Sequence, residues 1–170
     1  MQIMADICEL EELDVNSFKK DMREAFQLAF EQVYGKTDEE ILTGEYIDKA
    51  LSNDKSFAVK AVCDGELVGG AVVFVEGSEG YLDLLYVKTG YQGKGIGKSI
   101  WFYIEKAYPN VSLWKTATPY FDKRNLHFYI NVCGFKATEF MNPKHPSEKY
   151  PNDPNTMDES DYFFRFEKCC

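Results

Sequence analysis

The chain has 170 residues, of which 45% are hydrophobic and 28% are charged, and its formal net charge is −9. A chain of this length is expected to form one domain, over residues 1–170, around one core. The negative charge argues against nucleic acid as a partner, because phosphates would be repelled, and it suits a cationic partner such as an amine, although acidity also simply aids solubility.

Six elements are expected in the first half of the chain, divided by turn residues. They are a strand over Gln2–Glu9, a helix that begins at Asn16 or Ser17, a helix over Glu39–Leu51, two hairpin strands on either side of Asp64-Gly65, and a strand over Tyr81–Val87. The first helix has apolar residues at helical spacing, and Gly35 is expected to end it. Alternating apolar residues around an Asp-Gly pair predict the hairpin, because that pair favours the tight turn between antiparallel strands.

Five elements are expected in the second half. They are a helix over Gly95–Tyr108, a strand over Val111–Thr118, a helix over Asp122–Cys133, a strand over Phe135–Met141 and a strand over Asp161–Glu167. Pro109 is expected to end the first of these helices and Gly134 the second. Between the last two strands, Asn142–Met157 holds four of the six prolines. We therefore expect a long loop there, of a kind that often carries function.

The cysteines show neither the paired spacing of a zinc site nor an even number, so we expect no metal and no disulfide framework. They are Cys8, Cys63, Cys133, Cys169 and Cys170. This use of cysteine fits a reducing, cytoplasmic location. The first residues lack the basic and apolar regions of a signal peptide, and no run approaches the roughly 20 apolar residues of a membrane span, so we expect no membrane partner.

A glycine-rich segment, Gln92–Gly97, connects a predicted strand to a predicted helix. The ATP-binding pattern G-x-x-x-x-G-K-[ST] would need a glycine at Gln92, and the dinucleotide pattern G-x-G-x-x-G, begun at Gly93, would need one at Lys98. Glycine N–H groups and a helix N-terminus can still converge on one anion, and Lys94 and Lys98 add positive charge. We interpret the segment as a diphosphate-binding loop, with a glycine-rich turn that holds no ligand as the alternative.

Two motifs resemble those of the GNAT superfamily of N-acyltransferases. The Q-x-x-G-x-G pattern of Gln92–Gly97, after the segment LDLLYV, resembles the acetyl-CoA signature of that family. The segment Asp122–Phe135, DKRNLHFYINVCGF, resembles its A-x-x-F-Y-x-x-x-G-F pattern, but Asn125 stands where alanine is usual and Asp122 where asparagine is common. The predicted order of elements, β-α-α-β-β-β-α-β-α-β-β, is also that of the family.

The resemblance implies an α/β (α+β) class with the GNAT fold, in which a single mixed central β-sheet has helices on both faces. The fourth and fifth strands, Tyr81–Val87 and Val111–Thr118, would splay apart in a V, and the pantetheine arm of acetyl-CoA would pair with the backbone exposed there. A backbone N–H within Leu85–Val87 would hold the thioester carbonyl. The residues implied to bind acetyl-CoA (CoA) are Leu85, Tyr86, Val87, Gln92, Gly93, Lys94, Gly95, Ile96, Gly97, Lys98 and Asn125.

The resemblance further implies an N-acetyltransferase in which a bound amine attacks acetyl-CoA directly, in a ternary complex. Tyr129 matches the tyrosine that in the family gives a proton to the departing thiolate, and a phenol with an ordinary pKa of about 10 is protonated for that step. Packing in the core is the alternative role. Asp83 is the first candidate for the base that takes the proton of the amine, with a capping or sheet-edge role as the alternative. It lies four residues before Val87, so we expect it on the same strand face, together with Tyr81.

Other polar groups are weaker candidates for catalysis. A water ordered by Thr116 and Thr118 is a further candidate for the base. The two histidines, His127 and His145, are expected to have surface or packing roles, although His145 lies in the long loop, where substrate contact is an alternative. No pattern places a base beside a cysteine, so covalent catalysis is a minor option.

The resemblance also implies that the first two helices and the Asn142–Met157 loop recognise the substrate. Acidic residues near these segments would attract a polyamine, an aminoglycoside or a peptide lysine, or would form only a solvated face. They are Glu31, Asp38, Glu39, Glu40, Glu45, Asp153, Asp158 and Glu159. The acceptor therefore stays open as an amine of a small molecule or peptide. A catalytically inactive acyl-CoA-binding sensor or interaction module is the main alternative, and members of the family often form homodimers.

Overall fold

The structure, a computed structural model, describes residues 2–146 and 159–170. The chain divides into two compact units, Met1–Ser112 and Leu113–Cys170, called the N-terminal and the C-terminal unit below. Along the described residues, strands and helices follow the order predicted from the sequence. The single domain expected over residues 1–170 stays a prediction. No helix in the described ranges combines the length and the apolar character needed to cross a membrane.

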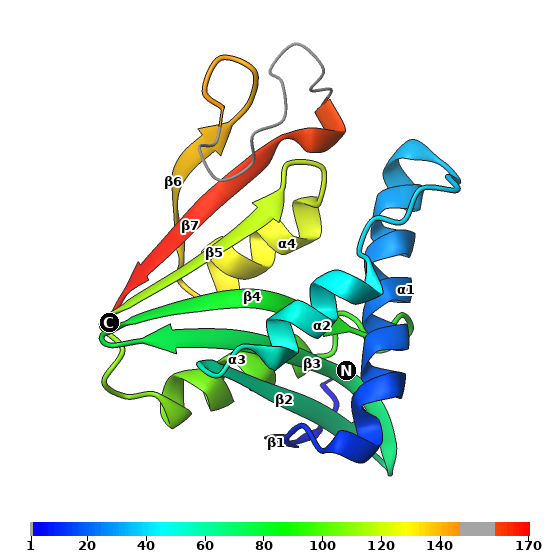
Figure 1. Ribbon diagram of the computed structural model, residues 1–170, viewed down its shortest axis with the longest axis vertical. Helices are drawn as coiled ribbons and strands as arrows, with labels where there is room; N and C mark the ends of the chain where they lie inside the picture. The colour runs from blue at the N-terminus through cyan, green and yellow to red at the C-terminus, as the bar shows by residue number, and fades with distance from the viewer. Residues whose placement is uncertain (1, 147–158) are drawn as a thin grey trace. The chain divides into compact units, whose positions relative to one another are not determined.

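The N-terminal unit contains four antiparallel strands in the order β1-β2-β3-β4 (Figure 1). They are β1 (Asp6–Glu9), β2 (Ser56–Cys63), β3 (Glu66–Glu76) and β4 (Glu79–Val87). Asp64 and Gly65 have positive φ values of 50° and 79°, so the predicted hairpin turn is confirmed. β1 is shorter than the predicted Gln2–Glu9, because the residues before it pair elsewhere: the Ile3 N–H donates to the Lys94 carbonyl (3.0 Å).

Three helices accompany this sheet, namely α1 (Val15–Tyr34), α2 (Gly44–Ser52) and α3 (Ile96–Ala107), and a short 3-10 turn, η1 (Glu12–Asp14), precedes α1. α1 ends at Gly35, whose φ is 86°, as predicted. α2 begins at Gly44 rather than at the predicted Glu39. The reason is local, since the Thr43 hydroxyl accepts the N–H of Tyr46 (3.1 Å) and caps the helix at that point.

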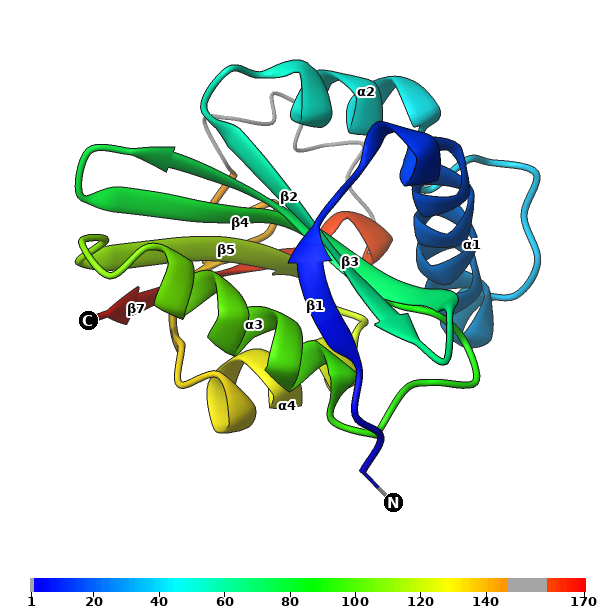
Figure 2. The same ribbon diagram turned by 90° about the horizontal axis from the view of Figure 1, so that it is seen from below.

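Two adjacent glycines in β3 let helices approach both faces of the sheet. A side chain at Gly70 would meet the Phe18 ring of α1, and a side chain at Gly69 would meet Ile100 of α3. Since neighbouring residues of a strand point to opposite faces, α1 and α3 lie on opposite sides, as Figure 2 shows. The α1 side holds a buried core cluster made of Phe18, Met22, Ile47, Val72, Leu84 and Tyr86.

Replacing Gly70 with alanine is expected to destabilise the protein by about 1–3 kcal/mol, the usual range for overpacking a core. The new Cβ would overlap the Phe18 ring and lie 2.6 Å from the Val59 carbonyl oxygen, a backbone atom with little room to move. Urea unfolding measures the change in free energy. Gly44→Ala is the matched control, because its Cβ would come no closer than 3.8 Å to Arg23. An equal loss of stability in both variants would contradict the close packing of Gly70 against Phe18.

The C-terminal unit contains β5 (Leu113–Pro119), β6 (Lys136–Met141) and β7 (Phe163–Cys169), paired antiparallel in the order β5-β7-β6. β7 begins later than the predicted Asp161, because a 3-10 turn, η3 (Glu159–Asp161), precedes it.

The helix predicted over Asp122–Cys133 is present, but its second half is widened. α4 (Lys123–His127), capped by the Asp122 carboxylate, continues into a π-helical turn, η2 (Phe128–Val132). The Cys133 N–H bonds to the Phe128 carbonyl (2.9 Å), which is the spacing of a π turn. Such turns often occur at functional sites.

Candidate functional site

The glycine-rich loop runs from β4 to α3. Gly90, Gly93 and Gly95 have φ values of 95°, 72° and 86°, in the left-handed region that favours glycine. Gly95 directly precedes α3, and no side chain caps the helix there. Within the described part of the chain, nothing accepts a hydrogen bond from the backbone N–H groups of residues 93–98. The loop therefore presents a row of unpaired donors at the positive end of a helix, an arrangement that binds anions.

Side chains of the same unit fix this loop. The Gln92 side-chain amide donates to the Val87 carbonyl (3.1 Å) and so ties the loop to the end of β4. The Gln2 side chain lies against Gly95, where an added Cβ would come within 3.2 Å of it. Gln92, one of the predicted cofactor residues, thus shapes the loop through its side chain.

Two lysines bring positive charge to the loop. The Lys94 Nζ lies 5.8 Å from the centre of the Tyr91 ring, and the Lys98 Nζ lies 5.5 Å from the centre of the Phe102 ring. Neither lysine forms an ion pair with a residue that the structure describes, so both charges are available to an anion. The unpaired donors and the two charges together fit a diphosphate.

Asp83, the candidate base, lies on a β-bulge in β4. Val72 and Val73 are neighbours in β3, but their partners in β4 are Leu84 and Leu82. Asp83 is therefore an extra residue, which the register of the two strands skips. Bulges of this kind are common next to active sites, because they redirect a side chain.

The bulge corrects one prediction about β4, since it interrupts the alternation of side chains. Asp83 does not share a face with Val87: the Tyr46 hydroxyl of α2 donates to its carboxylate (2.8 Å), whereas Val87 pairs with Gly69, which faces α3. Tyr81, before the bulge, lies on the α1 side as well. The candidate base thus faces the helices from which substrate recognition is expected.

Tyr46 is a site residue that the sequence did not reveal. It lies 37 positions before Asp83, and no short-range pattern joins an exposed tyrosine on a helix to a carboxylate on a distant strand. The predicted start of the second helix at Glu39 also gave no reason to single out this side chain. Only the folded N-terminal unit brings the two groups together.

The predicted cofactor residues at the end of β4 divide between the two faces of the sheet. Leu85 and Val87 lie on the α3 side. The Tyr86 side chain lies in the core cluster, 3% exposed, with its ring edge-on to Phe18 (5.5 Å between ring centres). No described residue forms a hydrogen bond with the Tyr86 hydroxyl, and burial raises its pKa. This leaves the backbone of Tyr86 as the part of the residue that is suited to meet a ligand.

Tyr86→Phe is expected to raise the free energy of unfolding by about 1 kcal/mol, because a buried hydroxyl without a partner is unfavourable. The ring keeps its contact with Phe18, and CoA affinity should not change. Urea unfolding and calorimetry measure the two quantities. Tyr91→Phe is the matched control, since it removes a hydroxyl that donates to Glu66 (2.8 Å) and should not stabilise the protein. A loss of stability in Tyr86→Phe would count against an unpartnered hydroxyl.

Tyr129, the candidate proton donor, lies in the π turn of the C-terminal unit and is 5% exposed. Its ring contacts those of Phe128, Phe135 and Phe166, with 5.3, 5.8 and 5.7 Å between ring centres. Burial raises the pKa of the Tyr129 phenol, and a hydrogen bond with Thr116 acts in the opposite direction. The phenol is therefore protonated at neutral pH, the form that can give up a proton.

Two buried threonines of β5 contact the helix of this unit. Thr116 bonds to Tyr129, and the Asn125 side-chain amide donates to the Thr118 hydroxyl (3.3 Å). The threonines are only 8% and 1% exposed. Each hydroxyl thus has one protein side chain as a partner, and the alternative of a water ordered by the two threonines stays a prediction.

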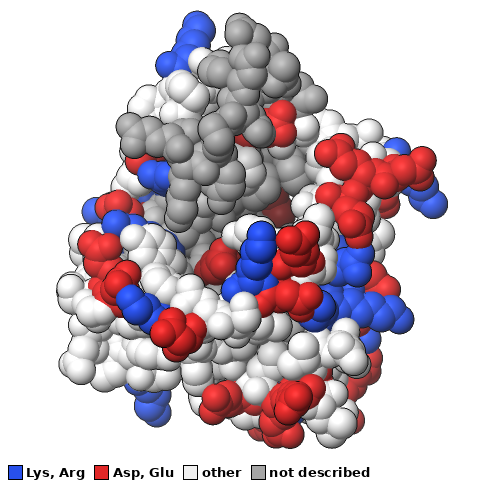
Figure 3. Space-filling model, in the orientation of Figure 1, with Lys and Arg blue, Asp and Glu red and all other residues white. Residues whose placement is uncertain are grey.

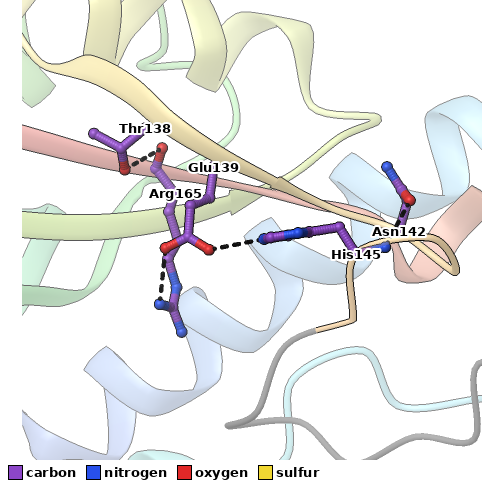
Figure 4. A network of polar contacts seen from close by, with 5 residues as sticks. All are labelled: Thr138, Glu139, Asn142, His145 and Arg165. Carbon is purple, nitrogen blue, oxygen red and sulfur yellow. Dashed lines mark hydrogen bonds and ion pairs between the residues drawn. The ribbon is translucent and has the colours of Figure 1, made fainter.

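The long loop begins with a turn that engages His145 (Figure 4). The Asn142 side-chain oxygen accepts the His145 N–H (3.2 Å), and the His145 Nε2 lies 3.1 Å from Glu139. Arg165 also contacts Glu139, at 3.3 Å. The hydrogen bond with His145, assisted by the charge of Arg165, lowers the pKa of Glu139. These contacts and the exposure of His127 fit the surface roles expected of both histidines.

Acidic side chains gather over the end of α1 and the segment that follows it, at the upper right of Figure 3. Asp38, Glu39 and Glu40 are exposed there. Gln27 of α1 fixes this segment, because its amide donates to the Glu39 carbonyl (3.0 Å) and accepts the Ile41 N–H (3.1 Å). Two of the acidic residues expected near the long loop lie outside the described residues: Asp153 and Asp158.

The chain is similar to known proteins in sequence and in fold. Residues 19–135 match the family described as "Acetyltransferase (GNAT) family". YrkN of Bacillus subtilis (strain 168), an uncharacterized protein, is 37% identical over 164 residues, which cover 92% of this chain and 89% of YrkN.

Two solved structures resemble the whole chain. An acetyltransferase from Bacillus subtilis in complex with CoA has a TM-score of 0.71 and 18% identity, covering 98% of this chain and 99% of that one. The PaiA N-acetyltransferase from Thermoplasma acidophilum in complex with coenzyme A has a TM-score of 0.67 and 20% identity, covering 99% and 100%. The predicted fold class is thereby confirmed. The splay between Tyr81–Val87 and Val111–Thr118 and the roles of the site residues stay predictions.

Proposed function

The chain belongs to the GNAT acetyltransferase family, and from this premise we propose that it moves an acetyl group from acetyl-CoA to a primary amine of a small molecule or peptide. The observation that carries the proposal is the row of unpaired N–H groups at residues 93–98, beside the charges of Lys94 and Lys98. Bound acetyl-CoA would supply a reactive thioester. Side chains and backbone groups of this protein would bind the coenzyme, stabilise the thioester carbonyl oxygen and transfer the protons.

In this proposal the N–H groups from Gly93 to Lys98 hold the diphosphate, because several donors and two positive charges meet there. Gln92 preserves the shape of the loop. A backbone N–H within Leu85–Val87 holds the thioester carbonyl oxygen, and this electrostatic contribution increases as negative charge develops on that oxygen. Asn125 is kept as a candidate contact for the pantetheine arm.

Two side chains are proposed to move protons. Asp83 takes one proton from the acceptor ammonium, which frees the nitrogen lone pair to form a bond to the acetyl carbon. As the carbon–sulfur bond breaks, Tyr129 gives one proton to the departing sulfur, and the second proton of the acceptor nitrogen passes to solvent, which leaves a neutral amide. Proton exchange with solvent then returns both side chains to their starting states. Burial raises the pKa of Tyr129, so the phenol keeps its proton until negative charge develops on the departing sulfur.

We propose a cationic amine as the acceptor and the cytoplasm as the location. The exposed carboxylates of Asp38 and Glu39 would attract a cation, whereas Glu40 already pairs with Arg23. No disulfide joins the five cysteines, all of which lie among the described residues, and this fits a reducing compartment.

A sensor that binds acyl-CoA without consuming it is the second candidate function. One observation favours it: Tyr129 is 5% exposed and surrounded by three phenylalanine rings, so packing alone would account for this residue. A sensor would retain the glycine-rich loop and its affinity for CoA, but it would need no base at Asp83.

Two measurements in sequence test the proposal. Calorimetry with CoA and with ATP should show binding of CoA and not of ATP. Release of free CoA thiol is then followed with acetyl-CoA and a panel of polyamines, aminoglycosides and lysine peptides. Thiol release with at least one amine supports the enzyme, whereas CoA binding without release supports the sensor. Absence of CoA binding would refute both functions.

A further inference from the structure

We propose that Tyr46 is the positioning residue of the acceptor side: it orients the Asp83 carboxylate so that its second oxygen takes the proton of the acceptor ammonium. The inference rests on the proposed function, since it concerns the same proton. It adds a residue that neither of the two family motifs contains. Both groups belong to the N-terminal unit, so their geometry is given by that unit alone.

The hydrogen bond from Tyr46 occupies one oxygen of the Asp83 carboxylate, and the second oxygen takes no part in it. The Tyr46 hydroxyl donates to the Asp83 Oδ1 (2.8 Å), and among the described residues no further donor reaches this carboxylate. Both side chains are exposed, Tyr46 at 41%. A carboxylate held through one oxygen has a restricted orientation, and the other oxygen belongs to an exposed side chain, which a substrate amine can approach.

The position of Tyr46 is itself fixed by the start of α2. Its backbone N–H donates to the Thr43 hydroxyl (3.1 Å), the cap of the helix. Its neighbour Ile47 is fully buried in the core cluster, which also contains Val72 and Leu84. The tyrosine therefore projects from a helical turn that is anchored on both sides, and a side chain on such a support can hold a partner in one orientation.

The hydrogen bond between Tyr46 and Asp83 differs from the ion pairs that other surface carboxylates of this unit form. Elsewhere in the unit, carboxylates engaged by another side chain commonly pair with a cation, as Glu66 does with Lys88 (3.0 Å) and Glu76 with Lys55. Asp83 instead bonds to a neutral hydroxyl, and no described Lys or Arg forms an ion pair with it. Its negative charge is thus left for a cationic group from outside, which is the chemistry of an acceptor ammonium.

A double-mutant cycle tests this inference with the most active amine of the panel. Tyr46→Phe keeps the ring and removes the donor, and it should lower kcat about tenfold, the range of one hydrogen bond to a charged group. In an Asp83→Asn background the same change should alter kcat less than about twofold, because the oriented base is already gone. The KM for acetyl-CoA and the melting temperature should not change.

Tyr34→Phe is the matched control, because Tyr34 is 40% exposed on α1 and its ring contacts Phe30 (5.0 Å). It should leave kcat unchanged. Equal effects of Tyr46→Phe in both backgrounds, or a fall in melting temperature that accounts for the lost activity, would overturn the inference and leave the enzyme standing. If no amine releases thiol from acetyl-CoA with the unmodified protein, the proposed function fails, and the inference fails with it.

Discussion

Replacing Tyr129 with phenylalanine is expected to lower kcat about a hundredfold, at the lower end of what a positioned acid contributes. The phenyl ring keeps the contacts with Phe128, Phe135 and Phe166, so the loss of stability should be limited to about 1 kcal/mol, for the hydrogen bond with Thr116. The missing hydroxyl no longer gives a proton to the departing sulfur. The rate of thiol release at saturating amine and acetyl-CoA measures the effect.

Tyr162→Phe serves as the control for this prediction, because it removes a half-buried phenol from the same unit at a position with no proposed role in catalysis. Calorimetry with CoA should give the same affinity for both variants and for the unmodified protein. An unchanged kcat in Tyr129→Phe would remove the donor role. Another group would then have to protonate the departing sulfur. If the unmodified protein is itself inactive, the result favours the sensor.

The second large effect is expected at the glycine-rich loop, where Gly93→Ala should weaken CoA binding about tenfold or more, as expected when hydrogen bonds to a charged group are lost. Gly93 has a φ of 72°, and a Cβ there would meet no atom within 4 Å. The substitution therefore acts by straining the backbone that directs the N–H groups, and not by a clash. Calorimetry with CoA measures the affinity.

Gly77→Ala controls for backbone strain alone. Gly77 lies in the turn between β3 and β4, has a φ of 61° and likewise has no atom within 4 Å of an added Cβ. Both variants should lose a similar free energy of unfolding, about 1 kcal/mol. Only Gly93→Ala should lose CoA affinity. Equal CoA affinity in the two variants would mean that the diphosphate is not held by this loop.

Features encoded by neighbouring residues were predictable from the sequence. The Asp64-Gly65 hairpin and the glycine stop at Gly35 depend on local backbone preferences, and both are confirmed. The glycine-rich loop was found in the same way, since its glycines and the helix that follows are contiguous. The order of elements followed from these local signals, and the two motifs supplied the family.

Features that depend on distant residues were not predictable. The bulge at Asp83 exists because β3 and β4 pair in a register with one extra residue, and the segment LDLLYV reads as an unbroken strand. Alternation along that segment placed Asp83 and Val87 on one face, which is wrong. The contact with Tyr46 arises only after α2 docks on the sheet. The length of the first strand was overestimated because Ile3 forms a hydrogen bond with a loop far along the chain.

The extra residue in β4 has a consequence for how proteins with this strand register can diversify. Because the register of β3 and β4 skips position 83, a change of side chain there leaves the neighbouring strand pairs in place. If Asp83 contacts the acceptor as proposed, selection can alter charge or size at this point and change which acceptors are used, while the loop proposed to bind the coenzyme is inherited unaltered. Paralogues with one coenzyme and many substrates are the expected evolutionary outcome.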